Sequence, residues 1–292
     1  MKKIILICFG LFHLLSCKSE GNKTSQLKKE TQMNFSQDQN IYKIKLSCSL
    51  PYKLLLNDLI IDEDDGAEGG AIETNSFVNS FILISGVQHL KIVVQSKKNE
   101  DSISTRSLDY INIQIVKLKD INSKNSELIN EFNISSAINI SKNTYQWEFN
   151  TIVPYKLQGW SDSINLLKED KEELMEEVIK FYTETHKILN SGNASKYQEL
   201  VSKRYEETLV AFYNNSGIQQ EKEELSQRVK DAKDKMNPLK DFVIKFYGNG
   251  KIITLENSSG DSPLNYSTEE FDDFFSIQLH RPKKGAPLEV IR

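Results

Sequence analysis

Cysteine is scarce in this sequence, and most of it lies at the start of the chain. Of the three cysteines, Cys8 and Cys17 fall within the first seventeen residues and only Cys48 lies in the remainder. If the opening segment is removed, no disulfide can form within the chain, and its stability must come from hydrophobic cores of adequate size. We interpret Cys48 as a small buried side chain in a strand and not as a reactive thiol.

Common enzyme motifs are also missing. The sequence has no Gly-x-Ser-x-Gly nucleophile elbow and no glycine-rich phosphate loop. His89, His186 and His280 are too far apart for a zinc motif, so we interpret them as structural or surface residues. These absences favour a protein without a cofactor and without catalysis, calcium being the one ion considered further below.

Excess positive charge and a membrane-spanning segment are likewise absent. The 37 Lys and Arg residues against 41 Asp and Glu give a formal charge of −4, and removing Lys2 and Lys3 changes it to −6. This mild acidity argues against a nucleic-acid partner, which requires a basic face. The apolar run at residues 4–15 is shorter than the ~20 residues that an apolar helix needs to cross a bilayer.

The first seventeen residues nevertheless carry a recognisable signal. Lys2 and Lys3, the short apolar run and the small Ser16 have the layout of a secretory signal peptide over residues 1–16. The sequence Leu14-Leu15-Ser16-Cys17 resembles the lipobox of bacterial lipoproteins. This resemblance implies cleavage before Cys17 and a membrane-anchoring lipid on Cys17, which places the protein in the cell envelope. By analogy with lipoprotein sorting in enteric bacteria, Lys18 in place of Asp after the cysteine indicates the outer membrane.

Two folded regions are expected after a tether. Residues 17–40 are polar and lack periodicity, which predicts a disordered tether. Short alternating apolar runs then predict an antiparallel β-sandwich over residues 41–153. Its strands are expected at residues 41–48, 53–61, 77–84, 88–95, 110–117, 127–132 and 145–153, with a turn or bulge at Asn57-Asp58. Residues 77–94 resemble a hairpin common in exported immunoglobulin-like and jelly-roll modules.

The periodicity changes after Pro154, and an α+β domain is expected over residues 160–292. Apolar residues recur at helical spacing in segments 162–190, 194–213 and 218–236. A period of two then returns, with a hairpin turn at Gly248-Asn249-Gly250. Three helices packed on a four-stranded antiparallel sheet therefore follow the sandwich, in a two-domain α+β chain. The element order resembles the cone-shaped fold of nuclear transport factor two and its relatives.

One acidic segment is a candidate binding site. Asp62, Glu63, Asp64 and Asp65 form a dense run of carboxylates within a predicted loop at residues 62–75. Asp62, Asp64 and Asp65 suit calcium or a cationic protein surface, although the spacing does not fit an EF-hand, because Gly66 falls at the fifth position and Ala67 at the sixth. The alternative is a solvated acidic turn, which we favour.

A second candidate lies in the C-terminal region. A cone-shaped fold would enclose a pocket, lined by Tyr182, Tyr205, Phe246 and Phe275. The alternative, which we favour, is that these aromatic residues belong to an ordinary hydrophobic core.

Two classes of function are compatible with these features. We favour a non-enzymatic envelope lipoprotein that binds a protein or ligand, mainly through loops of the sandwich. Lipoproteins of this layout resemble, among others, the immunity partners of secreted antibacterial toxins. The alternative is an enzyme or small-ligand carrier that uses the C-terminal pocket.

Overall fold

The structure is a computed structural model that describes residues 39–66, 71–97, 100–134, 143–214 and 216–292. The predicted signal peptide, Cys17 and all but the last two residues of the predicted tether lie outside the described residues. No helix in the described part of the chain combines the length and the apolar character needed to cross a membrane.

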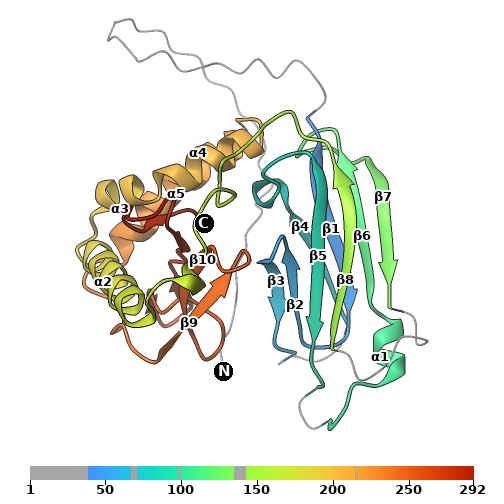
Figure 1. Cartoon of the computed structure of the whole chain (residues 1–292), viewed down its shortest axis with the longest axis horizontal. Coiled ribbons are helices and arrows are strands. Elements are labelled where there is room, and N and C mark those ends of the chain that lie inside the picture. The colour runs from blue at the N-terminus through green and yellow to red at the C-terminus, as the bar shows by residue number, and fades with distance from the viewer. Residues whose placement is uncertain (1–38, 67–70, 98–99, 135–142, 215) are drawn as a thin grey trace, which may run out of the picture.

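Two four-stranded antiparallel sheets form the first half of the chain and face each other (Figure 1). One sheet has the strand order β4-β1-β6-β7 and the other has the order β3-β2-β5-β8. The strands are β1 (Ile41–Cys48), β2 (Tyr52–Leu56), β3 (Leu59–Asp64), β4 (Ile72–Phe77), β5 (Gly86–Val94), β6 (Asn112–Leu118), β7 (Ser126–Asn133) and β8 (Thr144–Thr151). The connections include the 3-10 turn η1 (Asn79–Phe81) and the short helix α1 (Thr105–Asp109).

A period of two along the strands creates the core between the sheets. In β1, Ile44, Leu46 and Cys48 are buried, whereas the residues between them are partly exposed. The inward side chains of both sheets form one hydrophobic cluster. Cys48 belongs to it as a free thiol, and burial raises the pKa of that thiol. The predicted sandwich and the buried Cys48 are therefore confirmed.

The strand predicted at residues 77–84 is wrong, because a buried amide bends the chain there. Asn79 is fully buried; its Oδ1 accepts a hydrogen bond from the backbone N–H of Tyr42 at 2.7 Å, and its Nδ2 donates to the carbonyl oxygen of Asn40 at 2.9 Å. These bonds satisfy backbone groups of a neighbouring segment and hold residues 79–81 in a 3-10 turn. The pairing strand is instead the earlier β4.

Four helices follow the sandwich, where three were predicted. They are α2 (Lys171–Asn190), α3 (Ala194–Leu200), α4 (Ser202–Ala211) and α5 (Ser216–Asp231), preceded by the 3-10 turn η2 (Leu166–Lys168). The first helix begins later than expected because Asp170 caps it, accepting hydrogen bonds from the N–H groups of Glu172 and Glu173. The second predicted helix is divided at Val201, whose ψ of 9° lies outside the helical range.

A four-stranded antiparallel sheet of order β14-β13-β10-β9 completes the chain. Its strands are β9 (Phe242–Tyr247), β10 (Ile252–Asn257), β13 (Leu279–His280) and β14 (Glu289–Val290), and a separate hairpin contains β11 (Asn265–Ser267) and β12 (Asp272–Phe274). Helices and sheet share a second hydrophobic core. The α+β class, with a sandwich followed by helices on a four-stranded sheet, is confirmed.

The two halves contact each other over a defined interface. Leu59 of the sandwich forms a small buried cluster with Trp160, Ile252 and Ile291. At the end of α4, Phe212 and its neighbours are buried in the core of the sandwich itself. Figure 1 shows the sandwich and the helical half side by side. Whether residues 41–153 and 160–292 fold as separate domains stays a prediction.

Candidate functional site

A cleft of about 800 Å³ lies where the sandwich meets the C-terminal half. Outward-facing residues of β5 and β8 form one side, and the β2–β3 turn and the β9–β10 turn form another. The lining residues are Asn57, Asp58, His89, Leu90, Lys91, Gln146, Trp147, Glu148, Trp160 and Asn249. Polar and charged side chains therefore predominate in this cleft.

Cross-strand pairing brings the polar side chains of β5 and β8 together. His89 lies opposite Glu148 and Lys91 lies opposite Gln146, so all four share the outer face of the sheet. The Nδ1 atom of His89 is 3.2 Å from Oε1 of Glu148, and the two side chains are 67% and 65% exposed. This pair is accessible to a ligand.

Asp58 connects the two turns that border the cleft. Asn57 and Asp58 have positive φ angles of 52° and 65°, as a tight hairpin turn requires, which confirms the predicted turn. One Asp58 carboxylate oxygen is 2.6 Å from Nζ of Lys91, and the other accepts a hydrogen bond from the N–H of Asn249 at 2.9 Å. The predicted Gly248-Asn249-Gly250 turn is thereby held against the sandwich.

Asn57 fixes the floor of the cleft. Its Nδ2 donates to Oε1 of the buried Gln88 at 2.8 Å, and its Oδ1 accepts a hydrogen bond from the N–H of His89 at 3.1 Å. These bonds position the residue that carries the exposed imidazole. Hydrogen bonds therefore hold the floor of the cleft in place. The cleft offers hydrogen-bond donors and acceptors and carries both positively and negatively charged side chains, which suits a polar ligand.

The acidic candidate site lies elsewhere, and the loop predicted at residues 62–75 is too long, because β3 and β4 occupy its two ends. Asp62, Glu63 and Asp64 belong to strand β3, so alternate carboxylates point to opposite faces of the sheet. Asp62 accepts a hydrogen bond from the hydroxyl of Tyr52 at 3.0 Å, and Glu63 pairs with Lys53 at 2.5 Å.

Asp64 and Asp65 complete this acidic segment. Asp64 accepts a hydrogen bond from the N–H of Gly66 at 2.7 Å, and Asp65, just beyond β3, also has an interaction partner. Within the described ranges, no group of three or more His, Cys, Asp or Glu side chains is arranged to hold a metal ion. None of the four residues of this acidic segment lines the cleft.

The aromatic residues predicted for a C-terminal pocket lie in or against the second core. The Tyr182 hydroxyl donates to the carbonyl oxygen of Ile277 at 2.7 Å and accepts from the N–H of Leu255 at 3.1 Å. Phe275 is buried, and Tyr205 and Phe246 pack against the same cluster. Their arrangement matches the favoured alternative of ordinary core, and none of them borders the cleft.

A Ser–His–Glu chain with a buried serine and a buried histidine lies in the C-terminal half. Oγ of Ser163 is 2.5 Å from Nδ1 of His280, and Nε2 of His280 is 2.9 Å from Oε1 of Glu289. Because the carboxylate can only accept, the neutral imidazole carries its proton on Nε2, and the serine hydroxyl donates to Nδ1. Burial lowers the pKa of His280, while the hydrogen bond to Glu289 opposes that shift.

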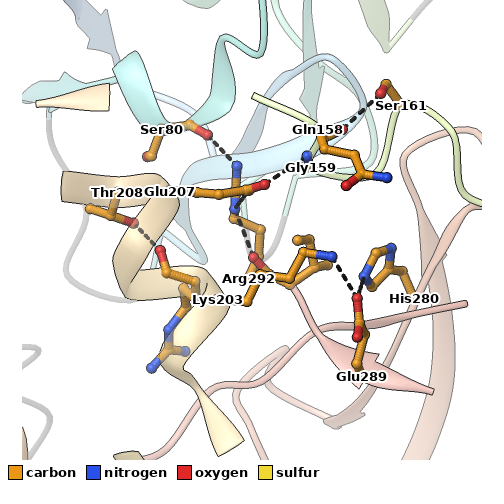
Figure 2. A network of polar contacts seen from close by, with 12 residues as sticks. Ser80, Gln158, Gly159, Ser161, Lys203, Glu207, Thr208, His280, Glu289 and Arg292 are labelled. Atoms are coloured by element: carbon orange, nitrogen blue, oxygen red, sulfur yellow. Dashed lines mark hydrogen bonds and ion pairs between the residues drawn. The ribbon is translucent and has the colours of Figure 1, made fainter. Parts of the chain in front are cut away.

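This chain continues into a network that joins the two halves, which Figure 2 shows in part. Lys203 of α4 is 2.5 Å from the same Glu289 oxygen. Nearby, Arg292 pairs with Glu207 at 3.0 Å and donates to the carbonyl oxygen of Ser80 in the sandwich at 2.7 Å. Ser163 and His280 are only 7% and 1% exposed, so they position strands β13 and β14 and offer no access to a substrate.

The residues of the cleft were not predicted as a site. The Asn57-Asp58 and Gly248-Asn249-Gly250 turns are visible in the sequence, as is the outward position of His89 on its strand. Nothing in the local pattern indicates that these turns, far apart in the chain, meet. No protein-family model, curated protein or solved structure matches this chain.

Proposed function

We propose that this protein is a lipoprotein of the outer membrane that binds a polar, on balance cationic, ligand or protein segment in the cleft, without catalysis. The sequence Leu14-Leu15-Ser16-Cys17 supports the lipid anchor. The observation that carries the binding proposal is the cleft lined by Asp58, His89, Lys91 and Glu148, whose turns are held by hydrogen bonds. Two carboxylates against one lysine favour a positively charged group on the ligand.

The binding surface in this proposal differs from the one predicted from the sequence. The partner is still expected to be cationic, but it binds the outer face of β5 and β8 and not residues 62–75. Glu148, 65% exposed, can exchange His89 for a ligand cation at little cost, because an exposed pair contributes only about 0–1 kcal/mol.

Site-specific crosslinking in cells tests the cleft. A photoreactive residue replaces Gln146, which lines the cleft, or as a control Ser126, which is exposed on β7 of the other sheet. We expect a covalent partner from position 146 alone. With that partner purified, Glu148→Gln should weaken binding by up to about fivefold, the effect of one exposed charge. The same products from both positions would contradict the cleft as the binding site.

The anchor has its own test. Replacing Cys17 with Ser should move the protein from the membrane fraction to the soluble fraction, because the lipid supplies the membrane affinity. Separation of inner and outer membranes from cells with the unchanged chain tests the assignment from Lys18. A Cys17→Ser protein that stays in the membrane fraction would contradict the lipobox interpretation.

An enzyme is the second candidate function, and the Ser163–His280–Glu289 chain is the observation that favours it. Because Ser163 is buried, we expect no reaction with a serine-directed fluorophosphonate probe under native conditions. Labelling that disappears in Ser163→Ala would replace the binding proposal with a hydrolase.

A further inference from the structure

The outer face of β5 and β8 changes from polar to apolar along its length. The cleft residues His89 and Glu148 occupy one part of this face. Toward the start of β5 and the end of β8, the face carries Val87 and Ile152, which are 51% and 71% exposed. Val87 is paired with Asn150, so Ile152 lies diagonally across from it on the same face. Ile84, 49% exposed, precedes β5 at this end.

We name these three residues, Ile84, Val87 and Ile152, the apolar end. It lies where the described chain begins. The side chain of Asn40 donates a hydrogen bond to the carbonyl oxygen of Ile152 at 2.9 Å. The hydroxyl of Tyr42 accepts one from the N–H of Ile152 at 2.8 Å. Figure 1 shows β1 starting at this end of the sandwich, opposite the end that carries α1.

The length of the preceding chain determines how far this end can lie from the anchor. A disordered chain of the ~23 residues from Cys17 to Asn40, as the sequence predicts, has a root-mean-square end-to-end distance of about 25–30 Å. The tether thus keeps the end of the sandwich where β1 starts, which includes the apolar end, close to the membrane. At such a short tether length even a weak contact is favoured, because the effective concentration of the membrane surface is high.

We propose that the apolar end docks on the surface of the bilayer that holds the lipid on Cys17. This inference rests on the proposed lipid anchor. Three aliphatic side chains that are 49–71% exposed in the free protein would enter the boundary between headgroups and acyl chains. His89 follows Val87 by two residues, or about 7 Å along a strand. Docking therefore places the cleft close to the lipid surface, and the ligand is bound there.

Lipid quenching of a fluorescent label tests the docking. The full lipidated chain, labelled through Asn150→Cys beside Val87 or through Asp109→Cys on α1 as a control, is reconstituted into vesicles. Cys48 is buried, which limits its labelling. The vesicles contain phosphatidylethanolamine and phosphatidylglycerol with brominated acyl chains. We expect quenching at position 150 to exceed that at position 109 by at least about twofold, because quenching by bromine requires contact with the lipid.

A triple variant tests which side chains are responsible. Ile84→Ser, Val87→Ser and Ile152→Ser together, in the Asn150→Cys chain, should reduce quenching to the level of the control label. The matched control replaces Leu128 and Val243, which are 54% and 51% exposed on other strands, with Ser and should leave quenching unchanged. An unchanged melting temperature shows that each variant is folded. Equal quenching at positions 150 and 109 would overturn the proposal.

The docking proposal and the lipid-anchor proposal can be contradicted separately. A protein that fractionates with the membrane but shows no preferential quenching at position 150 retains its anchor and lacks the docking contact. If Cys17→Ser does not release the protein from the membrane fraction, the Cys17→Ser chain is extracted, purified and added to the same vesicles. Preferential quenching at position 150 then supports docking without the lipid, and its absence overturns docking.

Discussion

Asp58 shows at the residue scale how one polar side chain joins distant segments. Its carboxylate pairs with Lys91 in the same sheet and accepts the N–H of Asn249 in the other half of the chain. Asn79 does the same at the opposite side of the interface, donating to the carbonyl oxygen of Ala211 at 3.2 Å. These bonds satisfy backbone groups that the contact between halves would otherwise bury unpaired.

Acid should destabilise the protein through His280. Burial lowers the pKa of His280 below its ordinary value of 6.5, so the unfolded state binds the proton more readily than the folded state does. The stability that depends on neutral His280 is present above about pH 6.5 and is lost as the pH falls toward the folded-state pKa. Urea unfolding at pH 7, 6 and 5 should show this decline.

Two variants assign the pH effect to this residue. His280→Gln should be less stable at pH 7 but should lose less additional stability at pH 5. His89→Gln, at the exposed imidazole, should retain the pH dependence of the unchanged protein. A parallel decline in all three proteins would assign the effect to other groups.

Removing Glu207, the ion-pair partner of Arg292, should destabilise the folded protein. Arg292 and Glu207 are 8% and 12% exposed, so Glu207→Ala leaves a buried guanidinium without its carboxylate. The expected loss is about 3 kcal/mol in the free energy of unfolding. Glu206→Ala is the matched control, because Glu206 is the exposed neighbour on the same helix, and it should change stability by less than about 0.5 kcal/mol. Chemical denaturation of both variants measures the difference.

At the element scale, strands with a regular period were predictable. The expected strand at residues 41–48 coincides with β1, because Ile44, Leu46 and Cys48 alternate with polar residues. The acidic second half of β3, residues 62–64, was predicted as part of a loop, because carboxylates are rare in strands. Lys53 and Tyr52, which pair with these carboxylates, lie on another strand. Propensity carries no information about such cross-strand partners.

The cleft shows a second limit of prediction at this scale. Both of its turns were predictable from their residues, since each requires positive φ angles. Their contact was not, because Asp58 and Asn249 are separated by 191 residues. The apolar patterns of the two halves each indicate an inner face, but neither indicates which outer face the other half covers.

Gly250 tests the packing of the β9–β10 turn. Its φ is +82°, and an added Cβ would lie 2.7 Å from both Asn165 Oδ1 and a Leu167 methyl group. Gly250→Ala should therefore cost the ~1–2 kcal/mol of the left-handed backbone plus a steric term. Gly285→Ala provides the control, because φ is +74° there but no atom lies within 4 Å of the added Cβ. Equal melting temperatures for the two variants would show that the turn moves without penalty.

At the scale of the whole molecule, the cleft exists only while the two halves stay in contact. Trp160 contributes to the cleft and to the small interface cluster, and the Arg292 guanidinium lies 5.0 Å from its ring. The same interface covers Phe212 and Tyr213 at the end of α4. Stability of the interface and formation of the binding site are therefore linked.

The last prediction concerns the separation of the halves. Residues 160–292 expressed alone should form a folded protein with a cooperative thermal transition, because α2, α3, α5 and the C-terminal sheet share their own core. Its melting temperature should be lower than that of the full chain, since Phe212 and Tyr213 lose the apolar cover of the sandwich.

A paired substitution separates the two cores. Phe212→Ser with Tyr213→Ser should destabilise the full chain by about 3 kcal/mol or more, because two large side chains are removed from a buried apolar site. The same pair should change the stability of the isolated fragment by less than about 1 kcal/mol, because both side chains are already exposed there. Calorimetry of the four proteins measures both effects. An insoluble fragment, or a broad transition without cooperativity, would show instead that the halves share one core and that the cleft lies within a single folding unit.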